Sequence, residues 1–147
     1  ARASNSLPTT LPTDLTTSID GAYSGTIPSE LGLLTKVTRL TLSELDSQER
    51  LSGPLPSQLG MMLRMSTFGA ESQTLTSTLP TQLGCFTALG AGGGSGLWLG
   101  NNNFTGRIPT ELGLLSEFTE EFELMSNRLT SSNDFCNGIP TEVATLS

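Results

Sequence analysis

Apolar residues recur along this chain at intervals of three, and each set begins at an apolar residue followed by proline. After Pro28, for example, apolar side chains follow at Leu31, Leu34 and Val37. The apolar–proline pairs are Leu11-Pro12, Ile27-Pro28, Leu55-Pro56, Leu79-Pro80, Ile108-Pro109 and Ile139-Pro140. The prolines are separated by 16, 28, 24, 29 and 31 residues, so a unit of 24 residues recurs with insertions. Self-similarity of this kind predicts a solenoid in which each copy forms one coil.

Each copy then changes from a period of three to a period of two. The alternating apolar pairs are Leu40 and Leu42, Phe68 and Ala70, Leu97 and Leu99, and Phe122 and Leu124. A period of two is that of a pleated strand. We therefore expect each coil to hold a turn or short helical segment and then a brief strand, with the strands stacked in parallel about 4.8 Å apart.

An asparagine that follows the alternating apolar pair predicts a sharp bend. Asn102 lies seven residues before Pro109, and Asn133 lies seven before Pro140. The side-chain amide of such an asparagine can satisfy backbone groups inside a bend, so both are expected to form a structural ladder. Gln73 holds the equivalent place one coil earlier, where we expect the ladder to be weaker.

The ends and three segments depart from the pattern. We expect residues 1–26 to form an irregular cap, because Ser18 stands where a strand leucine belongs, and residues 27–147 to form a solenoid of about five turns. The chain ends six residues into a new turn. Because the terminal coils of solenoids need capping, we expect the chain to be a fragment or to pack against a partner at this end. Insertions are expected within residues 43–50, 90–96 and 125–132, the glycine-rich second one as a surface loop.

The strings at residues 25–34 and 106–115 both read Gly-x-Ile-Pro-x-Glu-Leu-Gly-x-Leu, and Asn-x-Phe-Thr-Gly precedes the second copy's Arg107. These strings resemble the plant-type leucine-rich repeat of receptor-kinase ectodomains and polygalacturonase-inhibiting proteins, over roughly residues 22–147. The resemblance implies an α/β repeat: a curved solenoid with a concave parallel sheet, short 3-10 or irregular convex segments, and a second short strand near Gly-x-Ile-Pro. It also implies binding of proteins, peptides or cell-wall polymers, in an extracellular or lumenal compartment.

Composition argues against several other classes of function. The formal net charge is −7, and the 7 basic residues are dispersed, so we expect no nucleic-acid partner. No apolar run is long enough to span a membrane. The chain has no histidine, which removes the commonest general base and the Ser-His-Asp arrangement. We expect no catalysis, cofactor or metal site, and we interpret the glutamates of residues 117–123 as a solvated acidic face.

The residues that alternate with the strand rungs should face solvent on the concave side and bind a protein partner. The expected contact residues are Arg39, Thr41, Glu71, Trp98, Glu121 and Glu123. Trp98 is the single tryptophan and lies between two core leucines, with Gly96 and Gly100 beyond them. Tryptophan is enriched among interface hot spots. An alternative left open is that its ring folds over the neighbouring rung as local packing.

Two other functions remain open. The chain could be a structural subunit of a larger assembly. A ladder of hydroxyls, one residue after each proline, could instead bind ice or polysaccharide; its members are Thr13, Ser29, Ser57, Thr81, Thr110 and Thr141. Asn103 begins a glycosylation sequon with Phe104 and Thr105 and should point outward, next to the inward Asn102. We expect Cys85 and Cys136 to be two thiols, because they lie on different sides of the coil.

Overall fold

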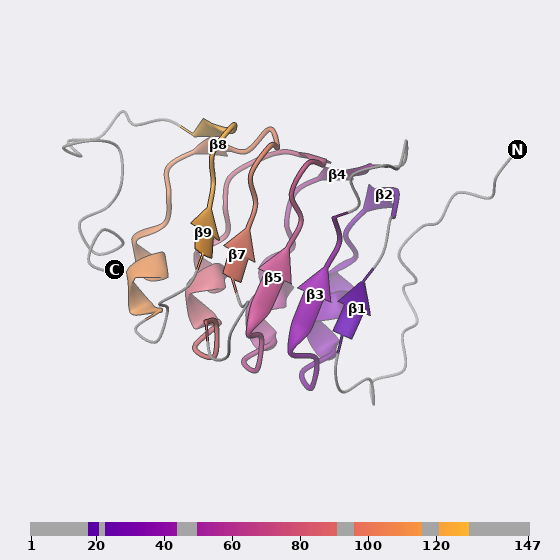
Figure 1. Ribbon diagram of the computed structural model, residues 1–147, viewed down its shortest axis with the longest axis vertical. Helices are drawn as coiled ribbons and strands as arrows, with labels where there is room; N and C mark the ends of the chain where they lie inside the picture. Colours follow the sequence, from indigo (N-terminus) through magenta and orange to yellow (C-terminus); the bar gives the residue numbers. More distant parts are fainter. Residues whose placement is uncertain (1–17, 21–22, 44–49, 91–95, 116–120, 130–147) are drawn as a thin grey trace, which may run out of the picture.

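The computed structural model describes residues 18–20, 23–43, 50–90, 96–115 and 121–129. Within these residues the chain winds into successive coils, each with a strand on one side and a short helix on the other (Figure 1). The leucine-rich-repeat solenoid expected from the sequence is confirmed. Several expected features lie outside the described residues, among them Asn133, Cys136, the centres of the first two insertions and the C-terminal end.

A five-stranded parallel sheet runs along the concave side in the order β1-β3-β5-β7-β9. Its strands are β1 (Ser18–Asp20), β3 (Arg39–Thr41), β5 (Thr67–Gly69), β7 (Gly96–Trp98) and β9 (Glu121–Glu123). The expected inward rungs lie in register, with Leu40 opposite Phe68, Phe68 opposite Leu97, and Leu97 opposite Phe122. The period of two therefore identified both the strands and their inward faces.

Four 3-10 helices of five residues each line the opposite side of the coil. They are η1 (Ser29–Leu33), η2 (Ser57–Met61), η3 (Thr81–Cys85) and η4 (Thr110–Leu114), each directly after a proline. The amide of Leu31 donates to Pro28 O, that of Leu34 to Leu31 O and that of Val37 to Leu34 O, at 3.2, 3.0 and 3.0 Å. This i→i+3 bonding explains why the buried leucines are three residues apart.

The helices stack closely because glycine occupies their fourth position. A Cβ on Gly60 would lie 2.6 Å from Cβ of Gln82 on the next helix, closer than real atoms approach. In the Leu-Gly pair of the repeat, the leucine is therefore buried in the core, and the glycine allows the next coil to pack closely.

Further strands of two or three residues form the edge between the main sheet and the helices. A three-stranded parallel sheet contains β2 (Gly25–Thr26), β4 (Leu51–Gly53) and β6 (Thr74–Leu75), and a two-stranded one contains β8 (Thr105–Gly106) and β10 (Arg128–Leu129). A single parallel bridge between Thr78 and Thr105 links the two. This is the second strand that the resemblance implied near Gly-x-Ile-Pro.

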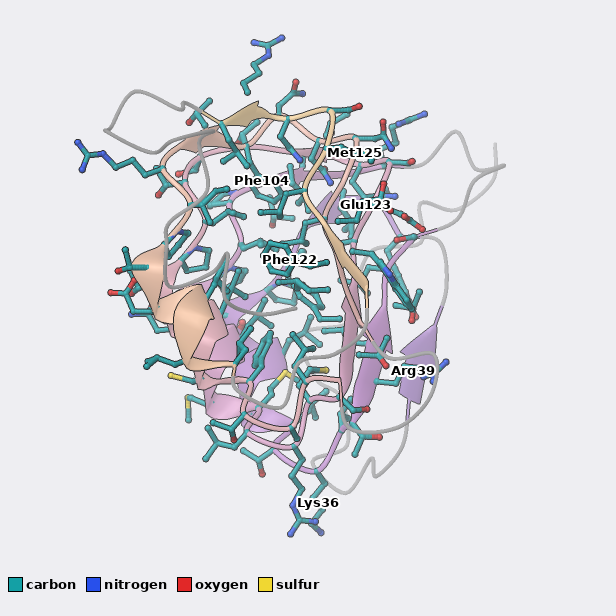
Figure 2. The ribbon with its side chains drawn as sticks, turned by 60° about the vertical axis from the view of Figure 1, so that its left-hand side comes forward. Lys36, Arg39, Phe104, Phe122, Glu123 and Met125 are labelled. Atoms are coloured by element: carbon teal, nitrogen blue, oxygen red, sulfur yellow. The ribbon has the colours of Figure 1, made fainter. Side chains whose placement is uncertain are left out.

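The core is one continuous ladder between sheet and helices. Leu40, Phe68 and Leu97 are completely buried, and Phe68 packs edge-to-face on Phe86 with ring centroids 5.9 Å apart. In Figure 2 Phe104 and Phe122 lie in this layer, between the helices and the strands. Among the described residues, no helix is long and apolar enough to cross a membrane.

The N-terminal region differs from the expectation in one respect. Ser18 was expected to occupy a rung position, but Ser18 is in register with Arg39 and it is Ile19 that is in register with Leu40. The expectation was wrong by one residue, because the first coil is short: Ile19 lies 7 residues after Pro12, whereas Leu40 lies 12 after Pro28, so the proline is a poor reference for this strand. Residues 18–20 therefore contribute a strand to the main sheet. The extent of the irregular cap stays a prediction.

Candidate functional site

Trp98 lies in a row of residues that crosses the main sheet, one strand from its end. In this row Asp20 is in register with Thr41, Thr41 with Gly69, Gly69 with Trp98, and Trp98 with Glu123. The last four alternate with the inward rungs, so they lie on the outer, concave face of the sheet. The sheet thus brings together residues that are up to 103 positions apart in sequence, from Asp20 to Glu123.

The indole ring of Trp98 lies over Gly69 of the neighbouring strand. A Cβ added to Gly69 would be 3.2 Å from ring atom Cε3 of Trp98 and 3.6 Å from the methyl group of Thr41. Trp98 is nevertheless only half-buried. The ring therefore packs locally on the next strand, as the alternative interpretation had it, and still presents part of its surface to solvent.

The sequence placed Gly69 on the concave face but did not identify it as the support of Trp98. The signal was present, because a glycine at an outward strand position often marks a close approach by another group. What the sequence does not contain is the register that places this glycine, rather than Gly96 or Gly100, beside Trp98.

Glu123 lies next to Trp98 on the outermost described strand. Its carboxylate folds back over the neighbouring coil, so that a Cβ on Gly100 would be 2.7 Å from its Oε1. Met125, two residues further on, is 67% exposed. Figure 2 shows Glu123 and Met125 close together, with Arg39 further along the same side of the molecule. This end of the row is therefore acidic, with an apolar side chain beside it.

A second row runs parallel to the first and contains Arg39 and Glu121. Ser18 is in register with Arg39, Arg39 with Thr67, Thr67 with Gly96, and Gly96 with Glu121. Arg39 is exposed, and only the backbone of Glu121 is described. Three strand spacings separate the two residues, which is about 14 Å at roughly 4.8 Å each.

Thr67 corrects one expectation about this face. Alternation indicated that its side chain should meet solvent, but it is 0% exposed. Its hydroxyl finds no hydrogen-bond partner in the described part of the chain. Gly69, Gly96 and Gly100 are buried as well. Alternation along a strand predicts to which face of the sheet a side chain points. Its exposure depends also on the larger side chains of neighbouring strands, which can cover a small residue.

Glu71 and Thr41 complete the expected contact residues. Both are half-buried. The Glu71 amide donates to Ser43 Oγ at 2.8 Å, and the Glu71 carbonyl accepts from Gln73 Nε2 at 3.2 Å. These bonds fix the backbone where the strand ends.

Asn102 lies inside the bend that follows β7 and is 6% exposed. Its Oδ1 accepts from the Leu75 amide at 3.0 Å. Its Nδ2 donates to the carbonyls of Ala70 at 2.7 Å, Leu99 at 3.2 Å and Gly100 at 3.2 Å. One side chain therefore joins two coils through four backbone groups. Gln73 makes two such bonds, accepting from the Leu51 amide at 2.8 Å besides its bond to Glu71.

In the next coil Asn127 makes the ladder hydrogen bonds. Its Oδ1 accepts from the Phe104 amide at 3.0 Å, and its Nδ2 donates to Leu99 O at 2.9 Å and Leu124 O at 3.0 Å. Asn133 lies outside the described residues, so its place in the ladder stays a prediction. Asn102 and Asn127 each lie three residues after a rung, at Leu99 and Leu124 respectively.

Asn103, the sequon asparagine, is half-exposed, and its backbone amide donates to Leu75 O at 2.8 Å. The sequon hydroxyl, on exposed Thr105, donates to Ser77 O at 3.4 Å. Cys85 is an exposed thiol at the end of η3. Among the described residues, no group of three or more His, Cys, Asp or Glu side chains could hold a metal ion.

Solved structures with the same coil architecture include plant receptor ectodomains. The Arabidopsis receptor kinase HAESA, in complex with the peptide hormone IDA and the co-receptor SERK1, matches with a TM-score of 0.73 and 27% identity over 86% of this chain and 20% of that one. The complex of BIR3 and SERK2 from Arabidopsis thaliana matches at 0.64 and 28% over 88% and 60%. A plant ice-binding protein matches at 0.64 and 25% over 76% and 34%.

The chain thus spans 20%, 60% and 34% of the length of these three proteins. No protein-family model and no curated protein matches the sequence.

Proposed function

We propose that this chain, a plant-type leucine-rich-repeat protein, binds a protein partner through the concave face of its five-stranded sheet, without catalysis. The observation that carries the proposal is the partly exposed indole of Trp98, which lies on β7, the fourth strand of that face, and is supported by Gly69. An aromatic ring that is already held in place loses little conformational entropy on binding and buries a large apolar area.

Charge on the two sides of Trp98 gives the proposed site a direction. Arg39 lies on β3, two strands from Trp98, and Glu123 lies on β9, the next strand on the other side. A ligand that crosses the sheet would therefore place an acidic group near Arg39 and a basic group near Glu123. Complementary charges of this kind contribute orientation and association rate more than affinity.

The dimensions of the site suit a short extended peptide or loop. An extended chain advances about 3.4 Å per residue, so about four residues cover the roughly 14 Å between Arg39 and Glu121. The HAESA structure contains a peptide hormone, which supports a peptide as the class of ligand. We propose that the ligand is a peptide segment with an acidic residue toward one end and a basic residue toward the other. An apolar or aromatic residue between them would pack against Trp98.

Selection from a displayed library of random heptapeptides tests this proposal. Peptides enriched on the immobilised chain should carry an apolar residue between an acidic and a basic one, and should be depleted when the Trp98→Ala variant replaces it. Enrichment of peptides that bind both proteins equally would contradict the proposed site.

An extracellular or lumenal compartment is part of the same proposal, and a glycan on Asn103 would mark it. The half-exposed Asn103 and the exposed Thr105 leave the sequon open to modification. The intact mass of protein secreted from plant cells should exceed the sequence mass by one N-glycan, and Asn103→Gln should remove the excess. Secreted protein without the excess would contradict the modification.

Ice binding is a second candidate, favoured by the match to a plant ice-binding protein. Ser29, Ser57, Thr81 and Thr110 are all exposed and begin four helices of equal length. These hydroxyls also form hydrogen bonds with neighbouring side chains; the Ser29 hydroxyl, for example, donates to the Glu30 carboxylate at 3.1 Å. Ice crystals grown with the chain should be faceted if this function holds, and unfaceted crystals would exclude it.

A further inference from the structure

The outer side of the 3-10 helices carries a row of exposed apolar side chains. In the first coil, residues 31, 34 and 37 point inward, as their burial shows. The same three-residue spacing places Glu30, Leu33 and Lys36 together on the outer surface, where all three are exposed. Leu33 therefore lies between an acidic and a basic residue along the coil.

The exposed apolar position repeats in the stacked helices, while among the described residues only the first coil carries both an acidic and a basic flank. The apolar row consists of the fifth residue of each helix: Leu33 (54% exposed), Met61 (49%), Cys85 (exposed) and Leu114 (66%). On one flank lies the second residue of each helix: Glu30, Gln58, Gln82 and Glu111. On the other flank lie Lys36 and Arg64, both exposed. Figure 2 shows Lys36 at the lower edge of the side that the helices form.

We propose that a second copy of this chain docks on the apolar row, around a two-fold axis that runs parallel to the row. An isologous contact of this kind needs a surface that is complementary to itself. Rotation about this axis lays each apolar residue against the same residue of the second copy. It also exchanges the two flanks, so that Glu30 faces Lys36 of the partner subunit.

The order of charges selects this axis and this occupant. A two-fold axis across the row would instead bring Glu30 opposite Glu111 of the partner subunit, with like charges in contact. In the first coil the flanks carry opposite charges, Glu30 on one and Lys36 on the other, and in the second coil Arg64 lies across from the neutral Gln58. The first-coil pair therefore fits its own rotated copy. This inference concerns the opposite side of the coil from Trp98 and goes beyond the proposed peptide binding.

Light scattering of the recombinant chain at about 100 μM and low salt tests the proposal. We expect a species of twice the 15.5 kDa chain mass, and dissociation as salt screens the flanking pairs. Met61→Glu should weaken self-association at least tenfold. Met125→Glu is the matched control, because it places the same charge at a methionine on the other face that is even more exposed. A monomeric wild-type chain at this concentration would overturn the proposal.

Charge exchange tests the axis without disturbing the apolar row. Glu30→Lys and Lys36→Glu should each weaken self-association several-fold, since each brings like charges together. The double variant should recover the affinity of the wild type, and far-ultraviolet circular dichroism should show that all three variants are folded. Self-association that persists in Met61→Glu, or a double variant no better than the singles, would overturn the proposed contact.

Discussion

Trp98 rests on Gly69, the residue directly in register with it on the neighbouring strand, and its Cε3 lies 3.2 Å from the position that a Gly69 Cβ would occupy. The absence of a side chain at residue 69 lets the indole lie across the sheet. A ring held in this way offers a fixed apolar surface to a partner.

A methyl group at residue 69 should therefore move the ring. We expect Gly69→Ala to displace the indole by a few tenths of an ångström and to raise its exposure. Because Trp98 is the single tryptophan, its emission reports the change directly. The emission should shift to longer wavelength and become easier to quench with acrylamide. Gly100→Ala is the control, because its methyl group meets only the end of the flexible Glu123 side chain; an equal shift there would contradict the account.

Loss of the Asn102 side chain should be costly. Asn102→Ala removes four hydrogen bonds and leaves buried backbone groups unpaired, so we expect a loss of about 2–4 kcal/mol in the free energy of unfolding. Asn127→Ala should cost less, because Asn127 is only half-buried. Asn103→Ala, at the outward neighbour, should change stability by less than about 0.5 kcal/mol. Urea denaturation measures all three, and equal effects at Asn102 and Asn103 would refute the ladder.

Ser77 occupies a backbone conformation that suits glycine. Its φ is +73°, and the residues at the same place in the other coils are Gly25, Gly53 and Gly106, with φ of +90°, +79° and +75°. Ser77→Gly should raise the melting temperature by relieving about 0.5–1 kcal/mol of backbone strain. Gly106→Ser should lower it by more, since its Cβ would lie 2.8 Å from the methyl group of Thr78. A destabilised Ser77→Gly variant would contradict this.

Thr67 has a buried hydroxyl with no hydrogen-bond partner in the described part of the chain. Thr67→Val keeps the shape of the side chain and removes the unpaired group, so we expect a gain of about 1 kcal/mol in the free energy of unfolding. Thr74→Val is the matched control, because the Thr74 hydroxyl donates to Leu51 O at 2.8 Å. That variant should be destabilised, and the same sign for both would show that the unpaired hydroxyl does not decide the effect.

The sequence predicted the periodic features well. The three-residue spacing of Leu31, Leu34 and Val37 reflects i→i+3 hydrogen bonds, and the two-residue spacing of Leu97 and Leu99 reflects the strand. Such periods follow from backbone geometry, which is the same in every coil. They therefore indicate which side chains are buried without any knowledge of neighbouring coils.

Features that depend on contact between coils could not be predicted in this way. Asn127 makes ladder bonds to the preceding coil, and counting back from the next proline did not select it. The burial of Thr67 and the support of Trp98 by Gly69 both depend on which residues lie in register across strands. Because the coils differ in length, the residues that lie in register can be identified only from the structure.

The affinity of a selected peptide for the wild-type chain and for Trp98→Ala tests the central claim most directly. Titration calorimetry should show a loss of about 2 kcal/mol or more, which is about 30-fold in the dissociation constant, while circular dichroism shows an unchanged fold. Arg39→Ala should weaken binding by a smaller factor. An unchanged dissociation constant for a folded Trp98→Ala protein would contradict the proposal that the concave face of the sheet binds its partner through this ring.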